Sequence, residues 1–470
     1  MKVRRRGMRW AGMATIMTGL ALAAQAAQAA TILGDWGTPI PLATGTAGTH
    51  PGMVVDTATN TIYTVYASGG AVYSRAVEMP SGTLGPAVQI LATGSSPSIA
   101  IDPAGNLHVA AYDTTATNLV YARSSTAGAS WATATIDGAA NHGSVTSITL
   151  DPANRIHIGY RGQNGTTDGT LTGKGNPGSD FYDLWYTRFN GDATTGDTTN
   201  PTNWDSPTVL VQSSRLTDGR SFIMLGTNMQ NLDIEADATN VWLLRREGAN
   251  SETQDGGYFF FRGVTAPAGT PFTASSGSPF GAGAAWAATM YGQFELREDG
   301  TPYRVTWDRM QRWIAPGTYD GLVGVPYDAT GSPVDTDPGA AGYQAYGIDT
   351  GLHSDVWWQV GQRMDLVIDV NDAYHALYHD NDSPNLGLKY AFSLDGVSWS
   401  TEFVSGGGSY SGDNRIAYDP LVSDGMGQVY LLSNSGGNLT LFYREARMIP
   451  EPATAAVLAV AGLLALRRRR

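Results

Sequence analysis

The sequence predicts an all-β protein built as a closed ring of four-stranded sheets, a β-propeller. Two observations support this fold class. Short runs rich in Val, Ile, Thr and Tyr alternate with turns of Gly, Asn, Asp and Pro along most of the 470 residues, which is the pattern of antiparallel meanders. The meander also recurs, and a sheet that cannot bury both faces alone needs neighbouring copies stacked against it.

The repeated unit is clearest from Pro97 to Trp131. Its first run ends at Asp102, its third run carries Tyr121 and Arg123, and its fourth run follows Trp131. Gly, Asn, Asp and Pro turns separate the runs, so the unit reads as four antiparallel strands. We interpret this unit as one blade of the ring.

Three signatures of the unit recur along the chain. An acidic turn after the first strand appears at Asp56, Asp102, Asp151, Asp237, Asp299, Asp369 and Asp424. An aromatic residue stands two positions before Arg75, Arg123, Arg188, Arg262 and Arg444, and Trp opens the fourth strand at Trp131, Trp204 and Trp399. The spacing suits propeller blades with insertions. Seven acidic turns predict seven blades; six is the alternative, because the fifth unit shows only two convincing strands.

The two ends of the repeat region complement each other. Residues 31–45, with Trp36, read like a fourth strand that lacks the three strands before it. The stretch from Tyr418 to Arg444 supplies three strands and no fourth. We therefore expect the N-terminal strand to complete the last blade, which closes the ring and removes two free sheet edges.

Three stretches interrupt the predicted propeller of residues 31–447. Residues 162–182 and 191–203 are polar and rich in Gly, Thr and Asn, whereas residues 308–362 combine many Gly and Pro with aromatic residues. Polar insertions suit exposed loops. A structureless loop as long as 308–362 is uncommon in a compact domain, so this insertion could cap one face.

The terminal segments predict export. Residues 1–30 combine a basic start, a short apolar stretch and small residues at Ala27 and Ala29, which is the pattern of a signal peptide. Residues 448–470 place Pro450-Glu451-Pro452 before an apolar run and four terminal arginines. That run is marginal as a membrane-spanning helix, for which about 20 residues are usual.

The C-terminal tail resembles the PEP-CTERM sorting signal of Gram-negative bacteria. The resemblance rests on Pro450-Glu451-Pro452, the apolar run and the basic end in that order. It implies recognition by an exosortase-type processing enzyme, transient anchoring in the inner membrane and delivery to the cell surface or an exopolysaccharide matrix. We expect contact with membranes only through the terminal segments.

Composition excludes several classes of site. The chain has no cysteine, so disulfides, thiolate zinc sites and a cysteine nucleophile are excluded. Residues 31–449 hold all but one of the acidic residues and all but nine of the basic ones, so this body is more acidic than the whole-chain charge of −13. Such a body should repel nucleic acid.

The segment from Ser393 to Trp399 resembles the Asp-box turn of sialidase-like, or BNR-repeat, propellers. Asp395, Gly396 and Trp399 carry the likeness, and the stretch from Ser124 to Trp131 is a second copy with Thr in the Asp position. The resemblance implies an architectural role, in which side-chain oxygens accept turn amides and Gly takes a positive φ. It does not imply sialidase activity, because the family's Arg-Ile-Pro start is absent. We expect the repeating arginines to pair with acidic groups between blades.

Ligands of propellers usually bind over the ring axis, near the starts of the first strands. Those positions hold His50, Ser96, His142, Gln230 with Asn231, Tyr291 with Gln293, Arg363, and Asn414 with Arg415. The set suits β-elimination on a uronate polysaccharide. Arg363 or Arg415 would neutralise the carboxylate, His142 or Tyr291 would take the proton, and His50 or Tyr291 would protonate the leaving oxygen. The alternative is that these residues are polar only because loops are polar.

Two further expectations concern metals and function. The acidic turn at Asp380 and Asp382 could hold Ca²⁺, although a solvated turn is the alternative; no other cofactor is expected. The sequence therefore predicts an exported propeller that binds extracellular polysaccharide or serves as a matrix scaffold. The alternative is a carbohydrate-active enzyme, foremost a uronate polysaccharide lyase and less readily a sialidase-type hydrolase.

Overall fold

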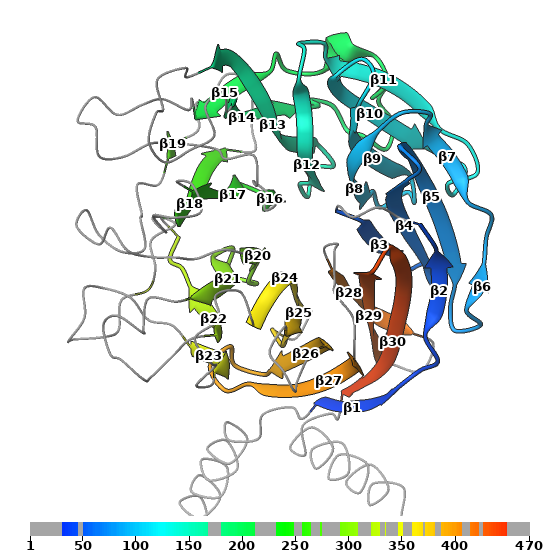
Figure 1. The fold of residues 1–470 in the computed structure, drawn as a ribbon, viewed down its shortest axis with the longest axis vertical. Helices are drawn as coiled ribbons and strands as arrows, with labels where there is room; N and C mark the ends of the chain where they lie inside the picture. Colours follow the sequence, from blue (N-terminus) through cyan, green and yellow to red (C-terminus); the bar gives the residue numbers. More distant parts are fainter. Residues whose placement is uncertain are drawn as a thin grey trace, which may run out of the picture.

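A computed structural model of the chain describes most of the predicted propeller. The described residues are 31–45, 50–167, 180–211, 232–248, 256–264, 273–274, 292–308, 321–329, 334, 346–350, 360–369, 372–380, 387–406, 414–422 and 426–448. They form seven antiparallel sheets arranged as a ring (Figure 1). The predicted seven-bladed propeller is therefore confirmed.

In each of the first four blades, the strands lie in chain order from the ring axis outward. Blade 1 contains β3 (Gly52–Asp56), β4 (Thr61–Ser68), β5 (Ala71–Glu78), β6 (Thr83–Leu84) and β7 (Val88–Leu91), the last two both pairing with β5. Blade 2 contains β8 (Ser95–Ile101), β9 (Leu107–Asp113), β10 (Asn118–Ser124) and β11 (Ala132–Asp137). Blade 3 contains β12 (His142–Leu150), β13 (Ile156–Thr167), β14 (Asp180–Arg188) and β15 (Thr208–Val211). Blade 4 contains β16 (Leu232–Ala236), β17 (Asn240–Gly248), β18 (Gly256–Val264) and β19 (Thr273–Ala274).

The remaining blades complete the circle. Blade 5 contains β20 (Gly292–Leu296), β21 (Pro302–Asp308), β22 (Gly321–Pro326) and β23 (Tyr346–Thr350). Blade 6 contains β24 (Val360–Ile368), β25 (Tyr374–Asp380), β26 (Gly387–Ser393) and β27 (Ser400–Gly406). Blade 7 contains β28 (Arg415–Val422), β29 (Met426–Ser435) and β30 (Asn438–Met448), together with β1 (Thr31–Trp36) and β2 (Ile40–Ala43).

Ring closure occurs in blade 7, as predicted. Both N-terminal strands pair with β30: β1 runs from Thr31 opposite Met448, and β2 begins with Ile40 opposite Leu441. Between them the chain crosses the ring of Tyr443, where a Cβ on Gly37 would lie 2.4 Å from the phenol carbon. Only glycine fits this crossing. The outer strand of blade 7 is therefore divided into β1 and β2 at this point.

Blade 5 is a complete four-stranded sheet, so the ring has seven blades rather than six. The stretch 308–362, expected as an insertion, supplies its third and fourth strands, β22 and β23, as well as the start of β24. The turn after β20 is also shifted from the prediction. The amide of Arg297 donates to the carbonyl of Thr301 at 3.0 Å, as Asp102 donates to Asn106 in blade 2. Arg297 thus occupies the position of Asp102, and Asp299 lies two residues later.

The other two expected insertions differ from each other. Strands β13 and β14 extend into 162–182, whose centre lies outside the described residues, as does the predicted turn at Asp424. Residues 191–203 form turns that end in the 3₁₀ helix η1 (Pro201–Asn203). This segment contacts blade 2, where the Tyr121 hydroxyl lies 2.9 Å from Thr198 Oγ1.

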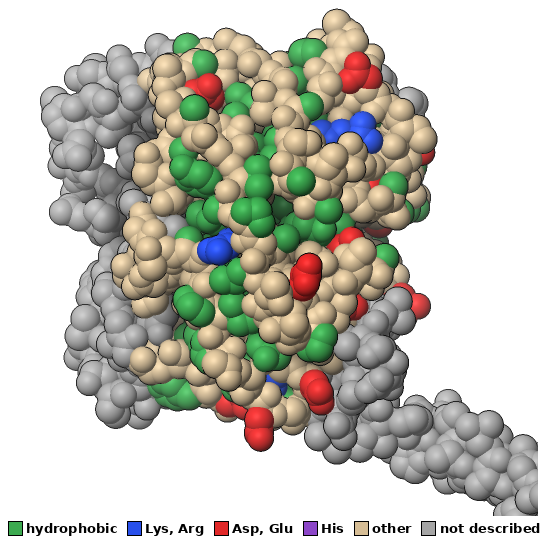
Figure 2. Space-filling view, turned by 90° about the vertical axis from the view of Figure 1, so that its right-hand side faces the viewer, with side chains coloured by type: hydrophobic (Ala, Val, Ile, Leu, Met, Phe, Trp, Pro, Cys, Tyr) green, Lys and Arg blue, Asp and Glu red, His purple; other side chains and the backbone are tan. Residues whose placement is uncertain are grey.

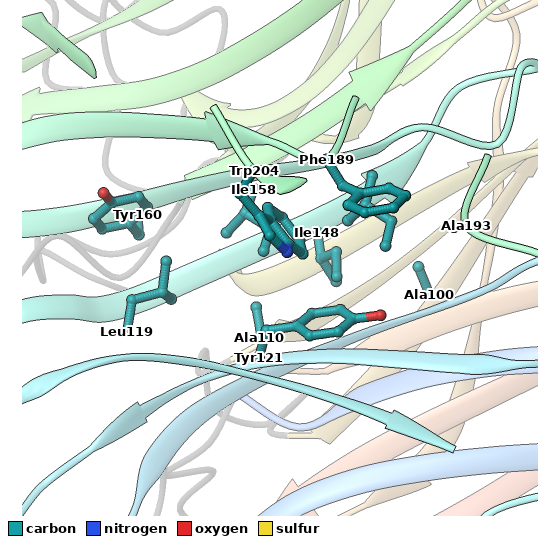
Figure 3. Close-up of a cluster of buried hydrophobic side chains, with 11 residues drawn as sticks. Ala100, Ala110, Leu119, Tyr121, Ile148, Ile158, Tyr160, Phe189, Ala193 and Trp204 are labelled. Carbon is teal, nitrogen blue, oxygen red and sulfur yellow. The ribbon is translucent and has the colours of Figure 1, made fainter. Parts of the chain in front are cut away.

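The hydrophobic core lies between the blades. Seven clusters of buried apolar side chains are found among the described residues, and each spans two neighbouring blades. Figure 3 shows the cluster between blades 2 and 3, in which Tyr121 faces Ile148, Phe189 and Trp204. A ring built from such interfaces has no single centre of burial, which leaves the axis free for polar side chains.

The repeating arginines join blades mainly through carbonyl oxygens, rather than through the expected acidic groups. Arg123 donates to the carbonyls of Thr194 and Gly196, Arg75 to those of Gly85 and Leu42, and Arg262 to that of Ala329. Arg188 pairs with Asp205 in its own blade and Arg444 pairs with Glu402 of blade 6, as expected of an acidic partner. A guanidinium has five donors, so it can satisfy several loop carbonyls at once.

The turns before the fourth strands of blades 2 and 6 are held by side-chain oxygens. In blade 6, Ser393 Oγ accepts the Gly396 amide at 2.9 Å and Asp395 Oδ1 accepts the Ser398 amide at 2.7 Å. Gly396 adopts a φ of 69°. The pKa of Asp395 is lowered, because turn hydrogen bonds to its carboxylate outweigh its partial burial. These contacts give the turn an architectural role.

The described residues contain no membrane-spanning helix, and the face seen in Figure 2 has no continuous basic patch. Within the described part of the chain, no helix is long and apolar enough to cross a membrane. On the face in Figure 2, Lys and Arg appear only as small separate groups among mostly uncharged atoms.

Candidate functional site

The turn after each first strand determines which side chains face the ring axis. In blade 2, Asp102 Oδ1 accepts the amides of Ala104 and Asn106, each at 2.9 Å. Asp151 holds the equivalent turn of blade 3 through Ala153 and Arg155. Because side chains alternate along a strand, residues two and four positions before this turn share one face.

That face lines a cavity on the ring axis. The cavity has a volume of about 160 Å³, and every blade contributes to its wall through its first strand. Four positions before the turn, blades 2 to 6 contribute Ser98, Ser147, Asp233, Gln293 and Asp365. Two positions before the turn, blades 4 and 5 contribute Glu235 and Glu295. We call this space the axial cavity.

The axial cavity is strongly acidic. Asp233, Glu235, Glu295 and Asp365 lie in its wall, and Arg415 from β28 is the single cationic side chain among the described residues that line it. All five are half-buried rather than exposed. With every carboxyl ionised, the wall would carry three more negative than positive charges in a confined space of low dielectric constant.

Confinement therefore raises the pKa values of the four carboxyl groups. Burial raises the pKa of Asp365 to about 7, although the nearby Arg415 opposes the rise. Burial also raises the pKa of Asp233, against Arg415 and a backbone hydrogen bond. For Glu235 and Glu295 the pKa is raised by burial first and by repulsion from the neighbouring carboxylates second. Burial and mutual repulsion therefore favour the protonated forms of these carboxyl groups.

Backbone and side-chain donors orient three of these carboxyl groups. Asp365 Oδ2 accepts the amide of Ile416 at 2.9 Å, and Asp233 Oδ2 accepts the amide of Phe294 at 3.3 Å. Glu235 Oε2 accepts the hydroxyl of Thr149 at 3.3 Å. Each bond runs to a neighbouring blade, so the carboxyl groups are positioned by the ring and not by their own strands alone.

Gln293 adds an unsatisfied polar group to the same wall. Its side chain is only 5% exposed, and its Oε1 has no hydrogen-bond partner among the described residues. A buried amide oxygen without a donor costs about 1–3 kcal/mol. A ligand that donates a hydrogen bond would remove that cost.

The sequence-predicted catalytic residues fall into three groups. Arg415 lines the axial cavity, while His50 and His142 are buried. Tyr291 lies outside the described residues, and Arg363 belongs to β24 with a side chain outside the described set. The convergence of the five residues therefore stays a prediction.

His142 is held by neighbours on both ring nitrogens. Its Nδ1 lies 2.7 Å from Asp137 Oδ2, and its Nε2 lies 3.2 Å from the carbonyl oxygen of Gln163. The Trp185 ring covers it, with ring centres 4.5 Å apart. This geometry fixes the imidazole within blades 2 and 3 and leaves neither nitrogen directed to an open site.

Three other histidines form a repeated structural network. His108 Nε2 lies 3.2 Å from Asp102 Oδ2 and its Nδ1 lies 2.6 Å from the Tyr121 hydroxyl. The same arrangement links Asp151, His157 and Tyr186 in blade 3, and Asp369, His375 and Tyr390 in blade 6. Burial lowers the pKa of His108 and of His157, so neutral rings suit these sites. The network ties each first-strand turn to strands two and three.

The turn that was expected to hold calcium contains an ion pair with a lysine. Asp380 is buried and pairs with Lys389, whose Nζ lies 2.6 Å from Asp380 Oδ2 and 2.8 Å from Asp349 Oδ2. Asp382 lies outside the described residues. No group of three or more acidic or histidine side chains among the described residues has the geometry to hold a metal ion.

Sequence reasoning missed the four cavity carboxyl groups. The predicted site comprised the starts of the first strands, which include Gln293 and Arg415. It did not include the alternate positions further along each of these strands. The signal was present: Asp233 and Glu235 stand two residues apart in a run of Leu, Ile and Ala. Charges at alternate positions of an otherwise apolar strand indicate a polar face that the fold must place somewhere.

Comparisons with known proteins found similar solved structures, all at low sequence identity. No family model matches the chain, and no curated protein matches it in sequence. Among solved structures, an ulvan lyase is similar with a TM-score of 0.47 and 11% identity, covering 87% of this chain and 93% of its own. The parainfluenza virus 5 haemagglutinin-neuraminidase with the ligand DANA is similar with a TM-score of 0.45 and 10% identity, covering 89% and 95%. A Hadza microbial sialidase is similar with a TM-score of 0.41 and 13% identity, covering 80% and 73%.

Proposed function

We propose that this protein is an exported propeller that binds an extracellular glycan by holding one sugar ring in the axial cavity. The observation that carries the proposal is the size and lining of that cavity. A volume of about 160 Å³ is close to the roughly 150 Å³ cavity that accepts one benzene-sized ring. The space is therefore suited to a single six-membered ring.

The lining suits a sugar ring rather than an aromatic one. Carboxyl groups, Arg415, Gln293 and the hydroxyls of Ser98 and Ser147 provide donors and acceptors around the wall. Ile99, Ile148 and Leu366 stand at the alternate positions of the same strands and pack into the cores between blades. Sugar rings present hydroxyls around their rim, so the polar wall finds hydrogen-bond partners on such a ring.

Uronate elimination is less well supported by the same geometry. The carboxyl groups that face Arg415 compete with a substrate carboxylate for its charge. His142, the sequence-predicted base, has both nitrogens engaged by Asp137 and Gln163. We therefore propose binding rather than catalysis.

A glycan array followed by calorimetric titration tests the proposal. Ser147→Trp places a large ring into the cavity wall and should abolish binding to any glycan the protein recognises. Ser400→Trp adds the same ring to an exposed position of β27, on the outer edge of blade 6, and should bind normally. Equal binding by both variants, or no glycan binding by the unmodified protein, would contradict the proposal.

Export and surface attachment are part of this proposal. Residues 1–30 direct the chain out of the cytoplasm, and residues 448–470 retain it in the membrane until an exosortase-type enzyme cleaves near Pro450-Glu451-Pro452. The support is the order of charged, apolar and Pro-containing segments in the sequence. Fractionation of cells that express the chain with and without residues 448–470 tests it. Retention of both forms in the cytoplasm would contradict it.

A further inference from the structure

We propose that the sugar held in the axial cavity carries a positively charged amino group, so that the protein recognises an amino-sugar residue of a polysaccharide. This inference rests on the proposed glycan binding and specifies the substrate class. It is carried by the distribution of charge around the cavity and by one unsatisfied amide.

The charges around the cavity come from four neighbouring blades. β16 contributes Asp233 and Glu235, β20 contributes Glu295, β24 contributes Asp365 and β28 contributes Arg415. The lining residues of β3, β8 and β12 are uncharged. An ammonium group placed against blades 4 to 6 would face carboxyl groups from three strands. Arg415 lies on β28, the fourth strand, and does not neutralise all of these carboxyl groups.

Gln293 provides an observation independent of the carboxyl groups. It lies in β20, where Glu295 follows two residues later, and Asp233 holds the equivalent position of the neighbouring strand β16. Its Oε1 has no donor among the described residues. The side chain is 5% exposed, so solvent does not compensate for the missing bond. A primary ammonium has three N–H donors and can supply the one that this oxygen lacks.

A metal ion fits the cavity less well than an organic ammonium. Calcium needs six to eight oxygen ligands at about 2.3–2.6 Å. The described acidic side chains do not gather closely enough to form such a group. The carboxyl groups surround a space of about 160 Å³ instead, so their natural complement is a ring-sized cation with donors that point in several directions.

Binding of such a cation would release protons. The raised pKa values of the carboxyl groups favour their protonated forms in the empty cavity, and an ammonium group favours their ionised forms. The affinity for the amino sugar should therefore increase as the pH rises from 5 to about 6, a range over which the amine of the sugar stays protonated.

Titration of the full-length protein with three probes tests the inference. The probes are a fully deacetylated chitosan oligosaccharide, the N-acetylated oligosaccharide of the same length, and an oligoglucuronate. The deacetylated probe should bind roughly tenfold or more tightly than the acetylated one, because hydrogen bonds to charged groups are stronger than neutral ones. Titration in buffers of different ionisation enthalpy should detect proton release with that probe alone.

The outcomes separate this inference from the proposed function. Equal or tighter binding of the acetylated or glucuronate probe would overturn the amino-sugar inference while glycan binding stands. Binding of none of the probes, together with an array on which no glycan binds, would overturn both. Tight binding of the deacetylated probe without proton release or pH dependence would place the ammonium outside the cavity and overturn the inference.

Matched variants locate the charge. Glu295→Gln and Asp365→Asn each remove one cavity charge with little change in shape, and each should weaken the deacetylated probe roughly tenfold. Glu78→Gln removes the same charge from an exposed position of β5 and should bind normally. Thermal unfolding of each variant shows that it is folded. An unchanged affinity in both folded cavity variants would overturn the inference.

Discussion

Arg444 stacks on Trp36, with its guanidinium carbon 4.5 Å from the centre of the indole ring. The contact joins β30 to β1, the strand that closes the ring, and Glu402 of blade 6 binds both partners. Trp36 also meets Tyr390 edge-on, with ring centres 5.5 Å apart. Closure thus depends on one aromatic side chain shared by blades 6 and 7.

Trp36→Ala should destabilise the protein by about 2–4 kcal/mol, because it removes a packed ring and its interaction with Arg444. Trp36→Phe should retain a large part of that stability. Denaturant unfolding measures both. Val209→Ala, at an exposed apolar residue of β15, serves as the control and should change stability little. An unfolding midpoint of Trp36→Ala equal to that of the control would show that the ring does not depend on this contact.

Deleting residues 31–45 should remove cooperative unfolding altogether. Blade 7 would lose its outer strand, and the backbone groups of β30 that pair with β1 and β2 would be left without partners. Differential scanning calorimetry shows whether one sharp transition remains. An unaltered transition would mean that the seventh blade holds the ring closed with three strands.

The Asp–His–Tyr networks of blades 3 and 6 should contribute additively to stability. Tyr186→Phe and Tyr390→Phe each leave one buried imidazole nitrogen without its partner, at 2.7 Å and 2.6 Å respectively. Each change should cost about 1–3 kcal/mol. The two sites lie in non-adjacent blades, so the double variant should lose the sum of the two. A double variant no less stable than either single one would indicate that the networks are coupled through the ring.

Stability should be greatest in mildly acidic solution, because two sets of carboxyl groups oppose each other. The pKa of Asp102 is lowered to about 2 by hydrogen bonds from His108 and Asn106, which outweigh its desolvation. Its contribution, roughly 2 kcal/mol, is present above its unfolded pKa and is lost as the pH falls towards 2. The axial carboxyl groups have raised pKa values, so their contribution is complete below pH 4 and is lost as the pH rises through about 7.

Asp365→Asn should reduce the loss of stability between pH 4 and pH 8 and leave the acid limb unchanged. Denaturant unfolding at a series of pH values, for this variant and for the unmodified protein, measures both limbs. Parallel curves across the alkaline range would show that Asp365 titrates as it does in the unfolded chain.

Gly396→Ala should destabilise the protein through the turn before β27. Gly396 has a φ of 69°, and a Cβ there would lie 3.0 Å from the ring of Tyr303. The left-handed conformation alone costs a non-glycine residue about 1–2 kcal/mol. Gly406→Ala is the matched control, since nothing lies within 4 Å of its Cβ position. Thermal unfolding compares the two, and equal transitions would show that the turn adapts.

The sequence by itself determined the blade. Alternation of apolar and polar residues, the acidic turn at Asp102 and the aromatic–Arg pair of the third strand are local, and local chemistry specifies strands and turns directly. It also predicted ring closure, because the orphan strand around Trp36 and the incomplete unit ending at Arg444 complement each other. Blade 5 was harder, since Arg297 replaces the Asp of its turn and its outer strands are separated by long stretches.

Only the tertiary structure decided the site. Asp233, Glu295 and Asp365 belong to three different strands, and no local pattern states that they share one space. They meet because each sits two or four positions before a turn, on one face of its strand, and because seven blades bring those positions to one axis. Their raised pKa values arise from that meeting, since burial and mutual repulsion exist only once the ring is closed. The bonds of Asp365 to Ile416 and of Asp233 to Phe294 likewise cross between blades.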